Sequence, residues 1–146
     1  MFEALEALTD RNSDRRDVAA AVLGDLLRGA VLDADAARLV VGRLVSVAVD
    51  EPVTKVRESA LNAISEAFNR YDFPLALVEP LAAAMPTMER ELLVHTLYIL
   101  GATHDPQARP LIAPYLRHLD PVVREEAQLA AAAITAVESR GLTRSS

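Results

Sequence analysis

The stretch DPVVREEA at residues 120–127 decides the fold, because similar stretches occur earlier in the chain. EPVTKVRESA at 51–60 is a good second copy, and TMERELL at 87–93 is a weaker one. Each copy contains an arginine followed at once by an acidic residue, and these arginines are 33 and 34 residues apart. They are Arg57, Arg90 and Arg124, with Arg16 as an outlying fourth. Self-similarity at a fixed period is the signature of a repeat architecture.

A second repeated motif precedes two of these stretches. LVEPL at 77–81 and LIAPY at 111–115 superpose with a shift of 34 residues, Leu on Leu and Pro on Pro. Both prolines fall inside segments that we expect to be helical. The period is therefore near 34, which suits a unit of two helices.

Composition and capping signals indicate helices along the whole chain. The residues are 51% hydrophobic but only 4% aromatic, so the apolar mass comes from Ala, Leu and Val. Asp105-Pro106 and Asp120-Pro121 each place an Asp N-cap before a Pro at the first helical position. We expect eight helices, at residues 2–8, 14–29, 33–49, 51–70, 74–85, 87–103, 106–118 and 121–138.

A two-helix unit of this size cannot bury its apolar face alone, so neighbouring units must stack in a row. The sequence therefore predicts an all-α solenoid of about four antiparallel helix pairs. We expect one domain over residues 1–138, followed by a flexible tail at 139–146. Within the domain, the expected units are a divergent N-terminal pair at 1–32 and repeats at 33–70, 74–103 and 106–138.

The copies at 51–60 and 120–127 resemble the second-helix signature of HEAT repeats. The copy at 87–93 lacks the Asp and the Val before its Arg, and the region around Arg16 matches only in the Arg and the following apolar face. The resemblance implies a right-handed α-solenoid with a concave face, lined by the second helices, where partners bind. Tetratricopeptide repeats share the period, but their Trp, Gly and Tyr pattern is absent.

Acidic residues of the second helices are the candidates for a binding surface. They are Glu58, Glu66, Glu89, Glu91, Glu125 and Glu126, in a chain of net charge −6. If they point outward, they steer a basic protein toward the concave face. Alternatively, acids in a first turn stabilise the helix dipole and need no partner, although Glu66 lies too late in its helix for that. The candidate partner-binding residues are Glu58, Asn62, Glu66, Glu91, His95, Tyr98, Glu125 and Gln128.

The repeated arginines have two interpretations. Arginine is suited to bidentate contacts with phosphate. The resemblance to HEAT repeats favours a structural role instead, in which Arg16, Arg57, Arg90 and Arg124 form a ladder between adjacent units. In that role we expect their side chains to be partly buried.

Several function classes find no support in the residues. The chain has no Cys, so thiol chemistry and disulfides are excluded. The negative net charge argues against nucleic acid as a partner. His95, His104 and His118 lack the spacing of a helical metal site, and the chain shows no glycine-rich phosphate loop, so we expect no metal and no cofactor. We see neither an export signal nor a membrane span, and we expect a cytoplasmic protein.

These observations predict a non-catalytic module, a monomer or a weak dimer, that binds a basic protein partner. Small, acidic, Cys-free HEAT-like proteins are similar to bacterial immunity proteins that neutralise a cognate toxin, which is the most concrete hypothesis. A general scaffold with several partners is the alternative. A HEAT-like lyase or hydroxylase is a further alternative and would need a bound cofactor or metal.

Overall fold

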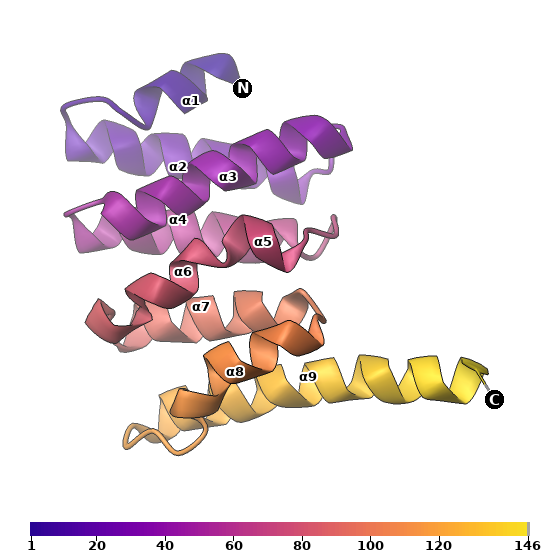
Figure 1. Ribbon diagram of the computed structural model, residues 1–146. Helices are drawn as coiled ribbons and strands as arrows, with labels where there is room; N and C mark the ends of the chain where they lie inside the picture. The colour runs from indigo at the N-terminus through magenta and orange to yellow at the C-terminus, as the bar shows by residue number, and fades with distance from the viewer. Residues whose placement is uncertain (146) are drawn as a thin grey trace.

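The computed structural model describes the backbone of residues 1–145 and the side chains of residues 1–140, and the elements within that range are helical (Figure 1). They are α1 (Phe2–Ala7), α2 (Ser13–Arg28), α3 (Ala34–Asp50), α4 (Thr54–Ala67), α5 (Leu75–Val78), α6 (Pro80–Ala84), the 3-10 turn η1 (Met85–Thr87), α7 (Arg90–Ala102), η2 (Pro106–Ala108), α8 (Arg109–Ile112), η3 (Ala113–Tyr115) and α9 (Pro121–Ser145).

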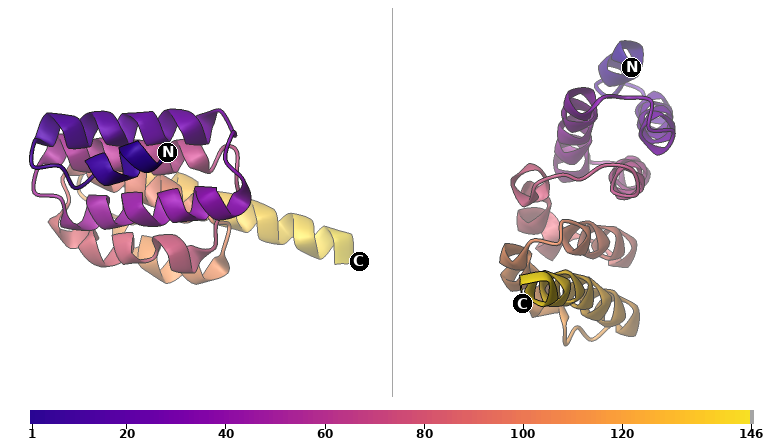
Figure 2. Two further views of the ribbon diagram at one scale, coloured as in Figure 1. Left: turned by 90° about the horizontal axis from the view of Figure 1, so that it is seen from above. Right: turned by 90° about the vertical axis from the view of Figure 1, so that its right-hand side faces the viewer.

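The helices are stacked as pairs in two layers. The segments α5, α6 and η1 follow one another as a single broken helix, and so do η2, α8 and η3, which gives eight helices within the described residues. Helix α2 packs on α4, α4 on α7 and α7 on α9, so these four, the second helices of their pairs, form what we call the second layer (Figures 1 and 2). Helix α3, the α5–α6 helix and α8 form the first layer, and α1 caps the N-terminal end. The expected all-α architecture of stacked helix pairs is confirmed.

Prolines break the two first-layer helices that we expected to be continuous. The segment expected at 74–85 is interrupted before Pro80, and the segment expected at 106–118 breaks into short pieces around Pro110 and Pro114. A proline lacks the N–H that would bond to the preceding turn, and its ring crowds the carbonyl four residues earlier. The repeated LxxP motif therefore marks a kink at the same place in two units.

Other boundaries differ from the sequence prediction. Helix α4 begins at Thr54 and α7 at Arg90, three residues later than expected. Helix α9 does not end at 138 but continues to Ser145 and projects past the other helices (Figure 2). The expectation that the last helix ends before residue 139 is therefore wrong, and the part of the expected tail at Ser146 lies outside the described residues.

Small residues set the spacing within the second layer. Gly101 of α7 is buried against Ala130 of α9, and a methyl group built on Gly101 would lie only 2.7 Å from the Ala130 Cα. Gly24 of α2 faces Ala63 of α4 in the same way, although with more room, at 3.1 Å between Cβ positions. Leucine, alanine, valine and isoleucine side chains, together with Phe73, Met85 and Met88, fill the rest of the core. The alanine-rich composition therefore allows helices to approach closely.

The repeated arginines make two kinds of contact, and Arg16 makes both, because it also donates to the backbone carbonyls of Asp10 and Arg11 at 2.9 and 3.1 Å. Arg16 pairs with Glu51 of the next unit through two 2.8 Å hydrogen bonds, and Arg90 donates to Asp120 of the next unit at 2.6 Å. Arg57 and Arg124 instead donate to backbone carbonyls within their own helix pair, those of Ala48 and His118. Only the Arg16–Glu51 and Arg90–Asp120 contacts join adjacent units.

Burial of the four arginines is also uneven. The Arg16 side chain is 14% exposed and Glu51 is 6% exposed, while Arg57 and Arg124 are partly buried. The Arg90 side chain is 54% exposed, so the expectation of partial burial is wrong there. Asp120 lies in the loop before α9, at the edge of the stack (Figure 1).

Candidate functional site

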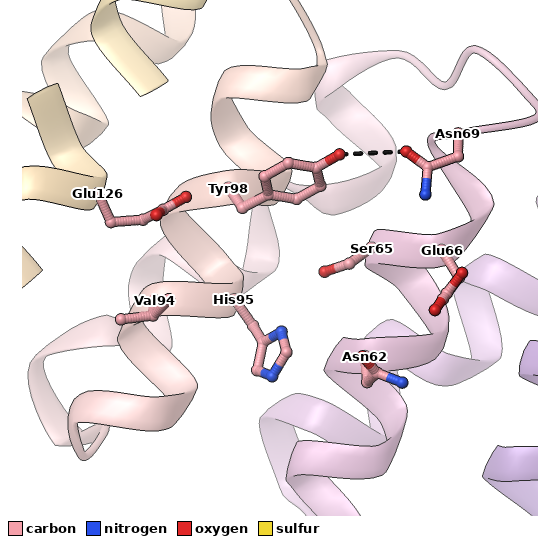
Figure 3. Close-up of a pocket in the computed structure, with 8 residues that line it drawn as sticks. All are labelled: Asn62, Ser65, Glu66, Asn69, Val94, His95, Tyr98 and Glu126. Carbon is pink, nitrogen blue, oxygen red and sulfur yellow. Dashed lines mark hydrogen bonds between the residues drawn. The ribbon is translucent and has the colours of Figure 1, made fainter. Parts of the chain in front are cut away.

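The exposed face of the second layer is hollowed into adjoining cavities along α2, α4, α7 and α9, and we call this face the groove. Two cavities matter most. The polar cavity, of about 230 Å³, is lined by Asn62, Ser65, Glu66, Asn69, Val94, His95, Tyr98 and Glu126 (Figure 3). The apolar cavity, of about 300 Å³, is lined by Phe68, Asp72, Tyr98, Gly101, Ala102, His104, Glu126, Leu129, Ala130 and Ala133.

Helical spacing explains why these side chains face the polar cavity. Asn62, Ser65 and Glu66 are three and four residues apart on α4, so they share one face of that helix. His95 and Tyr98 have the same relation on α7. Because α4 and α7 pack side by side, the two faces form opposite walls of the cavity.

Tyr98 divides the polar cavity from the apolar one. Its hydroxyl lies 3.2 Å from the Asn69 Oδ1 and donates to it, which ties the ring to the end of α4 (Figure 3). Glu126 of α9 lies on the other side of the ring (Figure 3). Both residues line both cavities, so an occupant of one cavity would be adjacent to an occupant of the other.

The apolar cavity is open to solvent although its walls are hydrophobic. Leu129 is 58% exposed and Tyr98 is 40% exposed at its edge. Gly101 and Ala130 form its floor, where the close approach of α7 and α9 leaves no room for larger side chains. Ligand sites commonly combine such apolar walls with a few polar groups.

Two further cavities continue the groove toward α2. One, of about 290 Å³, is lined by Asp17, Lys55, Glu58, Ser59, Asn62 and His95. The other, of about 120 Å³, is lined by Ala21, Gly24, Asp25, Arg28, Ser59, Asn62, Ala63 and Glu66. Asn62 lines both of these cavities and the polar cavity, so the groove is continuous from α2 to α9.

The cations along the groove are already paired with acids that lie beside them. Lys55 forms an ion pair with Asp14, and Arg28 forms one with Asp25. Among the described residues, by contrast, no ion pair involves Glu58, Glu66 or Glu126. Asp17 and Asp72 also line groove cavities and form no ion pair, so five carboxylates along the groove lack an ion-pair partner among the described residues.

Burial perturbs the ionisation of two groups in the polar cavity. It lowers the pKa of His95, although the nearby Glu58 carboxylate opposes this shift. It raises the pKa of Glu126, and the neighbouring Glu125 raises it further. Both shifts reflect the cost of holding a charge where little water reaches it.

The structure brings together five of the eight candidate binding residues. Glu58, Asn62, Glu66, His95 and Tyr98 line the groove cavities.

The other three candidates, Glu91, Glu125 and Gln128, are exposed and line none of the cavities described above. Glu91 shares the face of His95 but lies one turn nearer the start of α7. Glu125 and Gln128 miss the face of α9 that points into the groove, which Glu126, Leu129 and Ala133 occupy.

Several groove residues are not among the candidates predicted from the sequence. Ser65 and Asn69 follow Asn62 at helical spacing, and that spacing is the signal that identifies them. Glu126 was grouped with the acids of the second helices but not selected for binding. Leu129 gave no signal in the sequence, because a leucine in a helix is normally a core residue.

No group of three or more His, Asp or Glu side chains within the described part of the chain is arranged to hold a metal ion. None of its helices combines the length and the apolar character needed to span a membrane.

No protein-family model matches this chain, and no curated protein matches it. Crystal structures of two engineered proteins from the Northeast Structural Genomics Consortium do match its fold. The first gives a TM-score of 0.68 at 19% identity over 90% of this chain, and the second gives 0.67 at 18% identity over 90%. The chain spans 61% of the length of the first and 36% of the second. Together with the stacked helix pairs, these matches identify the fold as a helical repeat.

Proposed function

We propose that this protein is an interaction module that holds a basic segment of a partner protein in its groove. The observation that carries the proposal is the set of carboxylates of Glu58, Glu66 and Glu126, none of which has a cation partner among the described residues. Six of the 21 acidic residues, all of which lie in that part of the chain, form ion pairs, so these three are distinguished by their gathering along the groove and not by the lack of a cation alone.

Electrostatics favours a lysine- or arginine-rich occupant. A guanidinium or ammonium group in the polar cavity would balance Glu66 and Glu126 where little water competes. The long-range field of a chain with net charge −6 would also speed the encounter with a basic protein. The proposal includes no chemical reaction, metal or cofactor.

The resemblance to HEAT repeats supports the same surface, because partners of those solenoids bind along the second helices. Two biological roles fit this proposal. A dedicated neutraliser of a basic toxin would bind one partner tightly, as an immunity protein does. A scaffold would bind several partners through the same face.

Affinity capture from native cells with a pair of matched variants tests the proposal. In the groove variant, Glu58, Glu66 and Glu126 are each replaced by Gln. In the control variant, Glu89, Glu91 and Glu125 are each replaced by Gln; each variant removes three negative charges from the same net charge of −6. Tagged wild-type protein and both variants are compared by quantitative mass spectrometry of the eluted proteins.

We expect basic proteins to be captured by the wild type and the control variant and to be lost with the groove variant. One stoichiometric partner would indicate a neutraliser, and several would indicate a scaffold. Equal loss with both variants would show that only net charge matters and would contradict the proposal. Loss with the control variant alone would move the binding surface to the residues changed in that variant, Glu89, Glu91 and Glu125, and would contradict the proposal.

A further inference from the structure

The polar and apolar cavities adjoin, so the groove indicates a hydrophobic part of the partner segment as well as its charge. Tyr98 and Glu126 line both cavities, one as an aromatic wall and the other as a carboxylate. A segment that lies along the groove therefore contacts an acidic site and, directly beside it, a hydrophobic site.

The acidic site is formed by two carboxylates on opposite walls. Glu66 comes from α4 and Glu126 from α9, and neither has an ion-pair partner in the described part of the chain. The Tyr98 ring lies between these helices and is fixed by its hydrogen bond to Asn69 (Figure 3). Carboxylates beside an aromatic face form a suitable environment for a guanidinium group, which stacks on rings and donates several hydrogen bonds.

The hydrophobic site is formed by Leu129 and small residues beneath it. Leu129 is 58% exposed, and the Gly101 and Ala130 floor leaves a hollow of about 300 Å³ beside it. The cavity can take an aliphatic side chain such as Leu or Met, which would cover the exposed surface of Leu129 and Tyr98. Asp72 and Glu126 at the edge keep the mouth acidic, so an acidic neighbour is disfavoured.

We propose that the groove recognises a bipartite element in which a basic side chain and an aliphatic side chain project from the same side of the partner segment. The basic side chain, preferably arginine, enters the polar cavity between Glu66 and Glu126. The aliphatic side chain enters the apolar cavity over Leu129. This inference rests on the proposed function and adds the hydrophobic half of the recognition element.

The probes are short capped peptides of Gly and Ser that carry one Arg and one Leu. Side chains on the same side are two residues apart in an extended segment and four apart in a helix, so both spacings are used. Companion peptides replace the Arg by Gln or the Leu by Ser. Each peptide is titrated into the isotopically labelled full chain, and NMR amide shifts give both the affinity and the binding position.

At one of the two spacings, we expect the Arg-Leu peptide to bind about tenfold more tightly than either companion, which is the effect of burying one aliphatic side chain or pairing one buried charge. The shifts should centre on Tyr98 and Glu126. Glu126→Gln should remove the preference for Arg over Gln, and Leu129→Ser should remove the preference for Leu over Ser.

Two controls separate these losses from damage to the fold. Glu126→Gln should melt at the same or a higher temperature at neutral pH, because the raised pKa means that the ionised carboxyl is unfavourable in the folded state. Val122→Ser removes a similarly exposed apolar side chain of α9 that lies outside the cavities, and it should leave both preferences intact.

The outcomes distinguish this inference from the proposed function. If the Arg peptide binds at the polar cavity but Leu adds nothing, or if Leu129→Ser changes nothing, the bipartite element is overturned while basic recognition stands. If no peptide shifts groove amides and native capture does not depend on the groove acids, both proposals fail.

Discussion

Replacing Gly101 by Ala tests a close approach between two helices, the tightest of those at the described glycines. Gly101 is in α7 and faces Ala130 of α9, and it also forms part of the floor of the apolar cavity. An added methyl group would lie 2.7 Å from the Ala130 Cα, 2.8 Å from its Cβ and 3.1 Å from its carbonyl oxygen. Two of these three atoms belong to the backbone, so no side-chain rotation relieves the overlap.

Two opposing effects determine how much Gly101→Ala changes the free energy of unfolding. Alanine is favoured over glycine inside a helix by about 1 kcal/mol. Overpacking of a filled interior costs about 1–3 kcal/mol, and the upper end applies at Gly101 because α7 and α9 must separate by about 1 Å to restore ordinary contact. We expect a net loss of about 2 kcal/mol, which for a domain of this size lowers the melting temperature by about 4–8 °C.

Two other glycines provide the same substitution with more space. Gly42 in α3 has only the Leu77 Cδ1 at 3.7 Å, so Gly42→Ala should stabilise the protein by about 1 kcal/mol. A methyl group built on Gly24 would lie 3.1 Å from the Ala63 Cβ. The gain in helix propensity and the cost of crowding nearly cancel there, so Gly24→Ala should change the free energy of unfolding by less than about 0.5 kcal/mol.

Urea and thermal unfolding, followed by circular dichroism, measure the stabilities of the three variants. The stability should decrease from Gly42→Ala through Gly24→Ala to Gly101→Ala. If Gly101→Ala is as stable as Gly42→Ala, helix propensity alone governs all three sites, and the close approach of α7 and α9 does not exist in solution.

Three further predictions concern charge and backbone conformation. Glu51→Gln should lower the urea midpoint more than Asp120→Asn does, because the Arg16–Glu51 pair is more buried than the Arg90–Asp120 pair. Equal decreases in the midpoint would show that burial of the pair does not matter. Ala30→Gly should raise stability by about 1 kcal/mol in urea titrations, since Ala30 has a φ of 53° that glycine adopts without strain. Burial lowers the pKa of His95, so stability should be complete above the unfolded value of about 6.5 and fall as the pH drops below it. His95→Gln should reduce this fall in stability, which is measured by urea unfolding at several pH values. An unchanged dependence of stability on pH would count against the burial of His95.

The sequence determined the fold class because its signals are local and repeated. The arginine–acid pairs and the LxxP motifs recur near 34 residues, and a unit of that length must stack to bury its apolar face. Asp105 and Asp120 accept hydrogen bonds from backbone N–H groups two residues on, as their position before a proline predicted.

Helical spacing also carried part of the candidate site. Asn62 and Glu66 on one helix and His95 and Tyr98 on another were each predicted from a single helix, and the packing of α4 on α7 brings them together. A pair at positions i and i+3 or i+4 shares a face whatever the rest of the fold does.

Tertiary structure alone decided which acids lack a cation. Glu58 and Asp14 look equivalent in the sequence, but Lys55 reaches Asp14 across 41 residues and leaves Glu58 unpaired in the described part of the chain. Likewise Glu126 faces the groove and Glu125 does not, because the rotation of α9 about its axis is fixed by its packing on α7. Such contacts join distant parts of the chain, and their geometry depends on how every intervening helix packs, so no local pattern records them.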